Sequence, residues 1–469
     1  MKITKKTFIL LILNIILLPL LGNEQLNTFL HISKLATIIN YILPISLFGC
    51  LVYDSKGQNK YKLNLISVLS LIFIVILFLS WNFSICNKIY NVSNFIKFSL
   101  MIYFLYILNQ IEFSQKQKKI INYSIIYLLI FVCIIGVLQY IFKLGINLNG
   151  IEKYPGARGR INSTFYIATI YDKYLLISIL YCLFLLKNNL INKALVIIAF
   201  CLANLNLFFT FCRTSQIIIL IVYFIMIIYF FIKKRKHISI LIILMILLSF
   251  IIPGQNYLYS ATAKYFEDVV YKIDNKTHTN ILSKITKPIF NIFIIKVDNN
   301  SNNGNNSIEQ NPNQTNSSDN QQDNDIQLIE NIDYSLNSRK YFKSVAKNIM
   351  KSNPTLGIGI GSYNYIYENQ NASDYIKDKS FDTTSRYLYP HNMYYQLGAE
   401  IGILGMLIFF TIILYYLLKN KNLFSIMLLV IIILSCHTES IFYMKDVAYF
   451  TIFITSLFAS KNFNKKDKN

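Results

Sequence analysis

The chain has 469 residues, of which 54% are hydrophobic and only 14% charged, and its mean hydropathy is +0.44. A soluble globular protein carries about 25% charged residues, so this composition excludes an ordinary soluble fold and indicates a chain surrounded by lipid. The net charge of +22 would suggest a nucleic-acid partner for a soluble protein. In a membrane protein it indicates lysines in cytoplasmic loops, so no nucleic acid is expected.

Apolar segments recur along the chain at about the length that crosses a bilayer as a helix, which is about 20 residues. The twelve segments are 7–22, 35–53, 63–81, 92–108, 120–142, 166–186, 194–211, 214–232, 238–253, 397–418, 423–440 and 447–459. The sequence therefore predicts an all-α fold, a polytopic transmembrane helical bundle of about 12 spans. A large, partly disordered external loop bearing amphipathic helices completes the prediction.

Lysines mark every second connection between these segments. The basic segments are the N-terminal one, with Lys2, Lys5 and Lys6, and those at 56–62, 116–119, 187–193, 233–236, 419–421 and 461–468. Cytoplasmic loops carry the excess of Lys and Arg, so we expect a multi-pass protein of the plasma membrane with both termini cytoplasmic. The preference for Lys over Arg, 39 to 6, indicates an AT-rich bacterial genome.

This topology divides the chain into four parts. About nine spans lie in 1–253, a large extracytoplasmic loop covers 254–396, further spans lie in 397–460, and 461–469 form a cytoplasmic tail. Within the loop, the Asn-rich stretch 299–325 has almost no apolar residues and is predicted to be disordered. The stretch 333–353 has apolar residues at helical spacing, which predicts an amphipathic helix on the outer surface.

The six arginines have a different distribution from the lysines. They are Arg158, Arg160, Arg213, Arg235, Arg339 and Arg386. Only Arg235 is expected inside, and the other five are expected on or near the outer face. The planar guanidinium binds phosphate or carboxylate through two hydrogen bonds, so the group predicts an anion-binding site. The alternative for any single arginine is a pair with a loop acid or a lipid headgroup.

Arg213 lies between two apolar runs with almost no loop, and charge at membrane depth usually faces a cavity or a partner. The alternative is an arginine that snorkels from a tight hairpin. Arg158 and Arg160 precede the sixth apolar segment, and Asp172 and Lys173 follow about two turns into it. The latter two are interpreted as a neutralising pair or as part of a polar pocket.

His391 lies where the external loop returns to the membrane. A histidine at a cavity mouth takes a proton from a hydroxyl near neutral pH, as general-base catalysis requires. The alternative is an interfacial histidine bonded to backbone. Glu400 is about 13 Å further along a helix, too far for direct contact within that helix. Gly398 and Gly402 form a G-x-x-x-G step that predicts helix packing.

Several kinds of site are missing from the sequence. It has no P-loop, no H-E-x-x-H, no G-x-S-x-G and no acidic cluster suited to a divalent metal in the outer segments. The seven cysteines are interpreted as small buried hydrophobes. We therefore expect neither a metal nor another cofactor.

The loop and its flanks resemble the O-antigen ligase and polymerase family over about residues 150–440. The resemblance rests on Arg339, on the P-x-x-G-x-G-x-G turn with Gly357, Gly359 and Gly361, and on the His391-Asn392 pair leading to Glu400. Arg213-Thr214-Ser215 is similar to the family's Ser-Arg-type step. Arg160 to Phe165 resembles its R-x-x-G-T-F segment, although Ser163 replaces the glycine and the N-P-N that follows is missing.

The resemblance implies a metal-independent inverting glycosyltransferase of the GT-C type. Its donor would be an oligosaccharide on undecaprenyl diphosphate at the outer leaflet, and its other partners an acceptor glycan, the lipid bilayer and a chain-length regulator. Arg213 and Arg339 would bind the diphosphate with help from Arg160 and Arg158. His391 would be catalytic, and Asn392, Glu400 and the three glycines of the turn would support the site.

Three functions remain open at this point. A polymerase would join lipid-linked repeat units into a surface polysaccharide, and this is the interpretation we favour. A ligase would pass the glycan to lipid A core, a protein or a wall polymer. A lipid-oligosaccharide flippase is disfavoured, because transporters place charge near the midplane and often have repeated halves, whereas charge here concentrates on one face.

Overall fold

The computed structural model describes residues 1–21, 33–56, 65–86, 88–142, 144–147, 150–153, 160–165, 167–251, 339–368, 389–420, 422–460 and 463. The chain divides into two compact units, Met1–Met245 with Tyr341–Asn469, and Ile246–Lys340. Four predicted features lie outside the described residues. They are the stretch 299–325, Arg158, Arg386 and, apart from Phe463, the tail 461–469.

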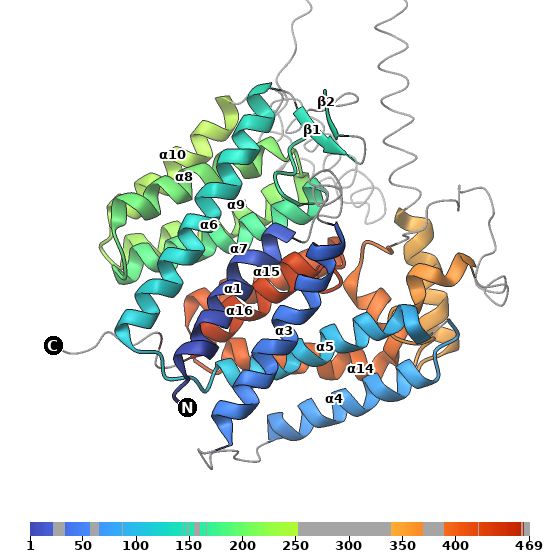
Figure 1. Ribbon diagram of the computed structural model, residues 1–469. Helices are drawn as coiled ribbons and strands as arrows, with labels where there is room; N and C mark the ends of the chain where they lie inside the picture. Colours follow the sequence, from blue (N-terminus) through green and yellow to red (C-terminus); the bar gives the residue numbers. More distant parts are fainter. Residues whose placement is uncertain are drawn as a thin grey trace, which may run out of the picture. The chain divides into compact units, whose positions relative to one another are not determined.

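The described chain is almost entirely helical (Figure 1). The helices are α1 (Lys5–Leu21), α3 (Ser33–Ser55), α4 (Leu65–Asn82), α5 (Lys88–Leu108), α6 (Gln115–Phe142), α7 (Ala168–Asn188), α8 (Lys193–Phe209), α9 (Arg213–Ile232), α10 (Lys236–Ile251), α14 (Met393–Leu418), α15 (Leu423–Thr438) and α16 (Lys445–Ala459). A further helical segment covers 339–352, and a 3-10 helix, η1, covers Ser362–Glu368. The strands β1 (Leu144–Asn147) and β2 (Gly150–Lys153) form an antiparallel hairpin that the sequence did not predict.

Each of the twelve predicted segments coincides with a helix. Among the described residues, α3, α4, α5, α6, α7, α9 and α14 are the seven helices long and apolar enough to cross a membrane. The helices α8, α10 and α15 are apolar but shorter, and α1 and α16 have 17 and 15 residues. The prediction of an all-α, multi-pass membrane protein is therefore confirmed. By length and composition, seven of the described helices are therefore candidate spans.

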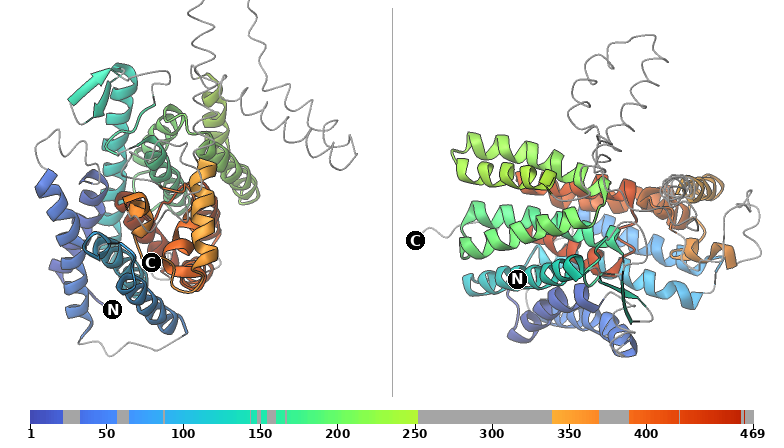
Figure 2. Two further views of the ribbon diagram at one scale, coloured as in Figure 1. Left: turned by 90° about the vertical axis from the view of Figure 1, so that its right-hand side faces the viewer. Right: turned by 90° about the horizontal axis from the view of Figure 1, so that it is seen from above.

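Helix α7 lies at the centre of the first unit. Its membrane-length window is 94% buried, and it packs against α8, α9, α15 and α16. The helices α4 and α5 pack with α14 and α16 on one part of the unit, and α6 packs with α8 on another. Figure 2 shows these helices running side by side in two further views. A polar group on α7 is consequently held inside protein and away from lipid, which lets α7 carry the charged residues described below.

The ends of the helices gather into two sets at opposite ends of the first unit. At one end, Thr4 N donates to Asp54 Oδ2 (2.9 Å), Glu112 N donates to Met1 O (2.9 Å), Arg235 Nη1 donates to Leu186 O (3.4 Å), and Asn420 Nδ2 donates to Phe458 O (3.1 Å). Each contact joins two segments that the lysine pattern predicts on the same side of the membrane. The candidate site residues of the first unit occupy the other end.

Candidate functional site

The glycine-rich turn that follows Pro354 is docked onto the backbone of α14. Helix α14 is kinked at Gly402, where φ is +75° and the helical conformation is lost. The kink frees the carbonyls of Ala399 and Glu400, which a regular helix would pair with residues four positions on. Ile358 N donates to Ala399 O (2.9 Å) and Gly359 N donates to Glu400 O (3.0 Å). The turn therefore satisfies the carbonyls that the kink exposes.

The contact is reciprocal and very close. Ile403 N, released by the same kink, donates to Pro354 O at 2.8 Å. A side chain at Gly402 would place its Cβ 2.0 Å from Thr355 O, and one at Gly357 would place it 2.4 Å from Ala399 O. The prediction that Gly402 serves helix packing is thus corrected, since it forms a backbone kink that receives another segment. Only glycine allows both the positive φ and the close approach.

The Glu400 carboxylate holds the far side of the same turn. Gly361 N donates to Glu400 Oε2 (2.6 Å), Tyr363 N donates to Glu400 Oε1 (3.1 Å), and the Tyr443 hydroxyl also donates to Oε2. Burial, together with the neighbouring Glu400 carboxylate, raises the pKa of Tyr443 well above its ordinary value, so the phenol stays neutral and donates. Ser80 Oγ adds a bond to Glu400 O at 2.7 Å. Glu400 is therefore a structural hub that fixes the turn.

The helical segment before the turn packs on the same base. Val345, Ala346 and Ile349 are buried with Ile358 and Tyr363 against Ala399 of α14. These positions include the apolar stripe from which the sequence predicted a helix. The stripe is covered by protein, so this segment is part of the first unit from residue 341 onward.

We expect Gly402→Ala to destabilise the protein by about 3 kcal/mol or more, because it adds left-handed strain and a clash with Thr355 O. Trp81 is the only tryptophan of the chain and neighbours Ser80, so its fluorescence reports the docked turn during thermal unfolding. Gly49→Ala is the matched control, because no atom lies within 4 Å of a Cβ at Gly49. A Gly402→Ala protein as stable as the Gly49→Ala protein would contradict this account of the kink.

His391 lies one residue before the N-cap of α14, in a left-handed conformation with φ of +47°. Its Nδ1 lies 2.9 Å from Glu439 Oε2, and the imidazole is 29% exposed. The following residue fixes this geometry. Asn392 Oδ1 accepts from Tyr395 N (3.0 Å) and caps α14, while Asn392 Nδ2 donates to His437 O (3.1 Å). The His391-Asn392 pair is thereby tied to the end of α15.

The pairing with Glu439 decides which ring nitrogen is available. With Nδ1–H donating to the carboxylate, Nε2 carries the lone pair and can accept a proton. Glu439 was not singled out in the sequence, although an acidic residue at the end of an apolar run is a detectable signal. The expectation that His391 and Glu400 do not meet directly within one helix agrees with the structure, because His391 pairs with Glu439 and Glu400 pairs with the turn.

Arg160 and Arg213 come together at the tight turn between α8 and α9. Arg160 Nε donates to Thr210 O (3.2 Å) and its Nη2 donates to Phe211 O (3.1 Å). Arg213 is the first residue of α9, and its side chain is half-buried. Burial raises the pKa of the intervening Cys212 thiol to about 12, so this thiol stays protonated. Arg160 therefore braces the turn that immediately precedes Arg213.

The Asp172–Lys173 pair lies beside this turn. Ser215 Oγ donates to Asp172 Oδ2 (2.6 Å), and Lys173 Nζ lies 2.5 Å from Ser215 Oγ and 3.4 Å from Asp172 Oδ2. Both charged side chains are almost fully buried. The Asp172 carboxylate is also within electrostatic reach of Glu439. The two residues therefore form the neutralising pair of the first interpretation, and the polar-pocket interpretation stays a prediction.

Ser163 explains the departure from the R-x-x-G-T-F pattern. Its φ is +51°, a left-handed conformation that glycine adopts without strain, so this position would suit the glycine that the pattern has there. The Ser163 hydroxyl donates to Val132 O (2.6 Å), and Ser163 N donates to Gln139 Oε1 (2.7 Å). These bonds offset the strain of the left-handed backbone.

Arg339 is the first residue of the helical segment 339–352 and belongs to the second compact unit. Arg158 lies outside the described residues. In the part of the chain that the structure describes, no group of three or more His, Cys, Asp or Glu side chains is arranged to hold a metal ion.

Comparison with known proteins gives one family. Residues 194–410 match the family model described as O-antigen ligase, a range that includes Arg213, Arg339, His391 and Glu400 but not Arg160. No curated protein and no solved structure matches the chain. Proteins of this family are enzymes that transfer glycans. Residues 194–410 of this membrane protein, a little under half of the chain, therefore match the O-antigen ligase family model.

Proposed function

We propose that the protein is a surface-polysaccharide polymerase. It transfers a glycan from undecaprenyl diphosphate to a hydroxyl of an acceptor glycan at the outer face of the bacterial plasma membrane. The observation that carries this proposal is the His391–Glu439 pair, together with the arginine-braced turn before Arg213, whose neighbour Asp172 lies within electrostatic reach of Glu439. One group binds a phosphate leaving group and the other accepts a hydroxyl proton, as glycan transfer from a lipid diphosphate requires.

The proposed reaction is a single displacement. The acceptor oxygen bonds to the anomeric carbon of the donor sugar, while the bond from that carbon to the diphosphate oxygen breaks. The acceptor proton passes to His391 Nε2, and the imidazolium is stabilised by Glu439. The polyprenyl diphosphate leaves with the bonding electron pair. Attack opposite the leaving group inverts the anomeric carbon.

Positive charge at the leaving group is the second requirement. Arg213 is proposed to stabilise the diphosphate as its charge develops, and Arg160 acts through the turn that it braces. Arg339 and Arg158 keep the diphosphate-binding role that the family resemblance implies. Arginine supplies this charge without a metal, so the proposed chemistry is metal-independent.

We propose an orientation in the membrane from the same division of residues. The helix ends that carry predicted cytoplasmic lysines pair with one another, and the proposed reactive groups lie at the opposite end. This arrangement supports an extracytoplasmic site for a donor that has already crossed the membrane.

The experiment that tests the function uses purified protein in lipid nanodiscs with a lipid-diphosphate-linked repeat unit from its host. A ladder of products without a second acceptor is the expected result. A single shifted product that appears only with another acceptor would instead identify a ligase. No transfer to any acceptor would refute glycan transfer and favour the flippase.

A further inference from the structure

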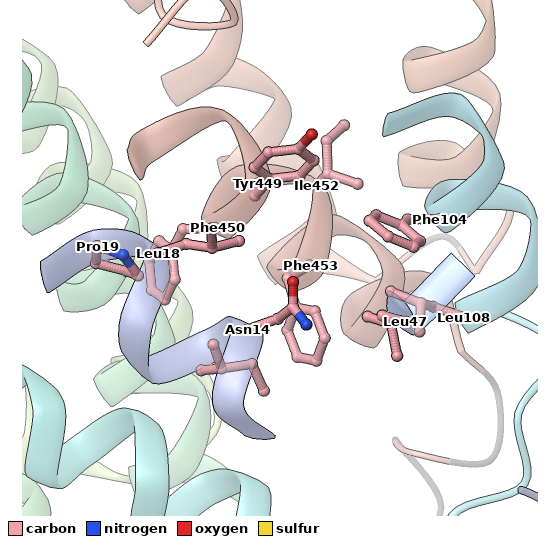
Figure 3. A pocket seen from close by; sticks show the side chains of 11 residues that line it. Asn14, Leu18, Pro19, Leu47, Phe104, Leu108, Tyr449, Phe450, Ile452 and Phe453 are labelled. Carbon is pink, nitrogen blue, oxygen red and sulfur yellow. The ribbon is translucent and has the colours of Figure 1, made fainter. Parts of the chain in front are cut away.

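A hollow between the described helices lies apart from the groups of the proposed reaction. It is lined mainly by apolar side chains, among them Leu18 of α1, Leu47 of α3 and Phe453 of α16 (Figure 3). No residue assigned to the reaction lines it. The hydrogen bonds that lead to the turn before Arg213 begin instead on α6, a helix that lines none of this hollow.

Gln139 of α6 is buried and uses both ends of its amide on one short loop. Its Oε1 accepts from Ser163 N (2.7 Å) and from Asn162 N (3.3 Å), and its Nε2 donates to Ser163 O (3.2 Å). The residue is only 5% exposed. A polar side chain in an apolar helix is costly at membrane depth, and such residues usually serve a function. These three bonds all go to residues 162 and 163, so the function concerns this loop.

The loop that the amide holds begins with Arg160. The Arg160 guanidinium donates to Thr210 O and Phe211 O, and Ile161 N donates to Phe209 O at 3.3 Å. The loop thus bonds to three consecutive carbonyls where α8 ends and the turn begins. A shift of the loop would consequently shift the turn that precedes α9.

The turn needs this support because its backbone is strained at Phe211. The φ of Phe211 is +50°, a left-handed conformation that is rare for a bulky side chain. Such a conformation persists only where the surrounding structure over-determines it. Phe211 O accepts from Arg160, and Phe211 N donates to Phe208 O at 3.0 Å. Helix α9 begins two residues later with Arg213, so relaxation of the turn would move Arg213.

We propose that Gln139 is a positioning residue for glycan transfer, which holds Arg213 at the diphosphate through the loop 160–163 and the turn. The proposal rests on the proposed function, in which Arg213 stabilises the leaving diphosphate. Gln139 itself contacts no reacting atom in this assignment. A guanidinium displaced by about 1 Å loses much of its stabilisation of the transition state, which can lower the rate about 10²-fold. The loss is expected in kcat, because Arg213 acts mainly in the transition state.

Glycan transfer by full-length variants in nanodiscs tests the proposal, with donor and acceptor concentrations varied. Gln139→Met keeps about the same side-chain size but loses the three bonds, and it is expected to lower kcat about 10–100-fold with the acceptor KM nearly unchanged. Gln139→Glu keeps an oxygen that accepts from Ser163 N and should recover part of the rate. Gln117→Met is the matched control. Gln117 Oε1 accepts from Ser114 N (2.9 Å) at the opposite end of α6, and its loss should leave kcat unchanged.

A double-mutant cycle identifies the route of the effect. Because Gln139 and Arg160 support the same turn, Gln139→Met in an Arg160→Ala background is expected to lower kcat by less than about twofold. In a Glu439→Gln background the proposed base is impaired and the turn is intact, so the full loss should persist. Full loss in both backgrounds would overturn the proposal, because Gln139 would then not act through Arg160.

Hydrogen exchange measures the support of the turn without depending on activity. Gln139→Met is expected to speed amide exchange in the segment 208–216, while exchange in the glycine-rich segment 357–363 stays as in wild type. Unchanged exchange over 208–216 would overturn the proposal even if kcat fell. Faster exchange in both segments would also overturn it, because it would assign Gln139 to the fold as a whole.

Failure of this proposal is distinguishable from failure of the proposed function. If wild type transfers no glycan while exchange over 208–216 changes as expected, the proposed function fails and the hold of Gln139 on the turn stands. If wild type forms a product ladder and Gln139→Met forms it at the same rate, the positioning role fails and the polymerase stands.

Discussion

Arg213→Ala is expected to lower the kcat of glycan transfer by about 10³-fold, while the protein remains folded in the membrane. The diphosphate gains charge as the anomeric bond breaks, and an arginine held at that point stabilises the transition state more than the bound donor. The braced turn holds Arg213 in place through the bonds of Arg160 to Thr210 O and Phe211 O. The measurement is single-turnover transfer from a labelled lipid-linked donor in nanodiscs.

Two further variants make this experiment specific. Arg213→Lys keeps the charge but loses the fork, so an intermediate rate is expected. Arg235→Ala removes an arginine at the opposite end of the first unit, where it bonds Leu186 O, and should leave kcat unchanged. Equal losses for Arg213→Ala and Arg235→Ala would mean a general effect of lost arginine rather than a leaving-group role.

His391→Ala is expected to lower kcat by about 10²–10⁴-fold, the range for removal of a general base. Binding of the donor should change little, because the imidazole is assigned to the acceptor hydroxyl and not to the diphosphate. The same single-turnover assay gives the rate, and native mass spectrometry gives donor binding. His237→Ala is the matched control, since His237 is exposed at the far end of α10. Full activity of His391→Ala would remove the general base from the proposed mechanism.

Substitutions of Glu439 can distinguish a role in catalysis from a role in the fold, because only the first changes kcat without changing KM. Glu439→Gln keeps the size of the side chain but loses the charge that stabilises the imidazolium, so kcat should fall about 10–100-fold with KM nearly constant. Glu439→Asp keeps the charge and should recover part of the rate. A fall in stability with no separation between kcat and KM would assign Glu439 to the fold alone.

The sequence was informative wherever one helix or one local motif held the signal. Apolar length located all twelve helices, and the spacing of Val345 and Ile349 located the helical segment before the turn. Arg213 and His391 were identifiable because charged and ionisable groups are rare at the edges of apolar runs. In each case the relevant information lies within about twenty consecutive residues.

Pairings between distant segments were not identifiable in the same way. Glu439 meets His391 across 48 positions, and Lys97 meets Tyr443 O across 346. Gly402 was interpreted as a helix-packing residue because its spacing from Gly398 is regular. Its true role depends on the backbone of Thr355, which only the folded chain brings near. The number of spans is supported in part, because seven described helices are long and apolar enough to cross a membrane and the other apolar segments form shorter helices.

The kink at Gly402 also joins the proposed base to a segment far from it in the sequence. The glycine-rich turn is bonded to α14 before the kink through Glu400 and after the kink through Ile403, so it splints the two parts of the helix. The part before the kink begins beside Asn392 and His391. The direction in which α14 presents His391 to Glu439 is therefore set by the turn, so a substitution in the turn is expected to act on catalysis at a distance from the reacting atoms.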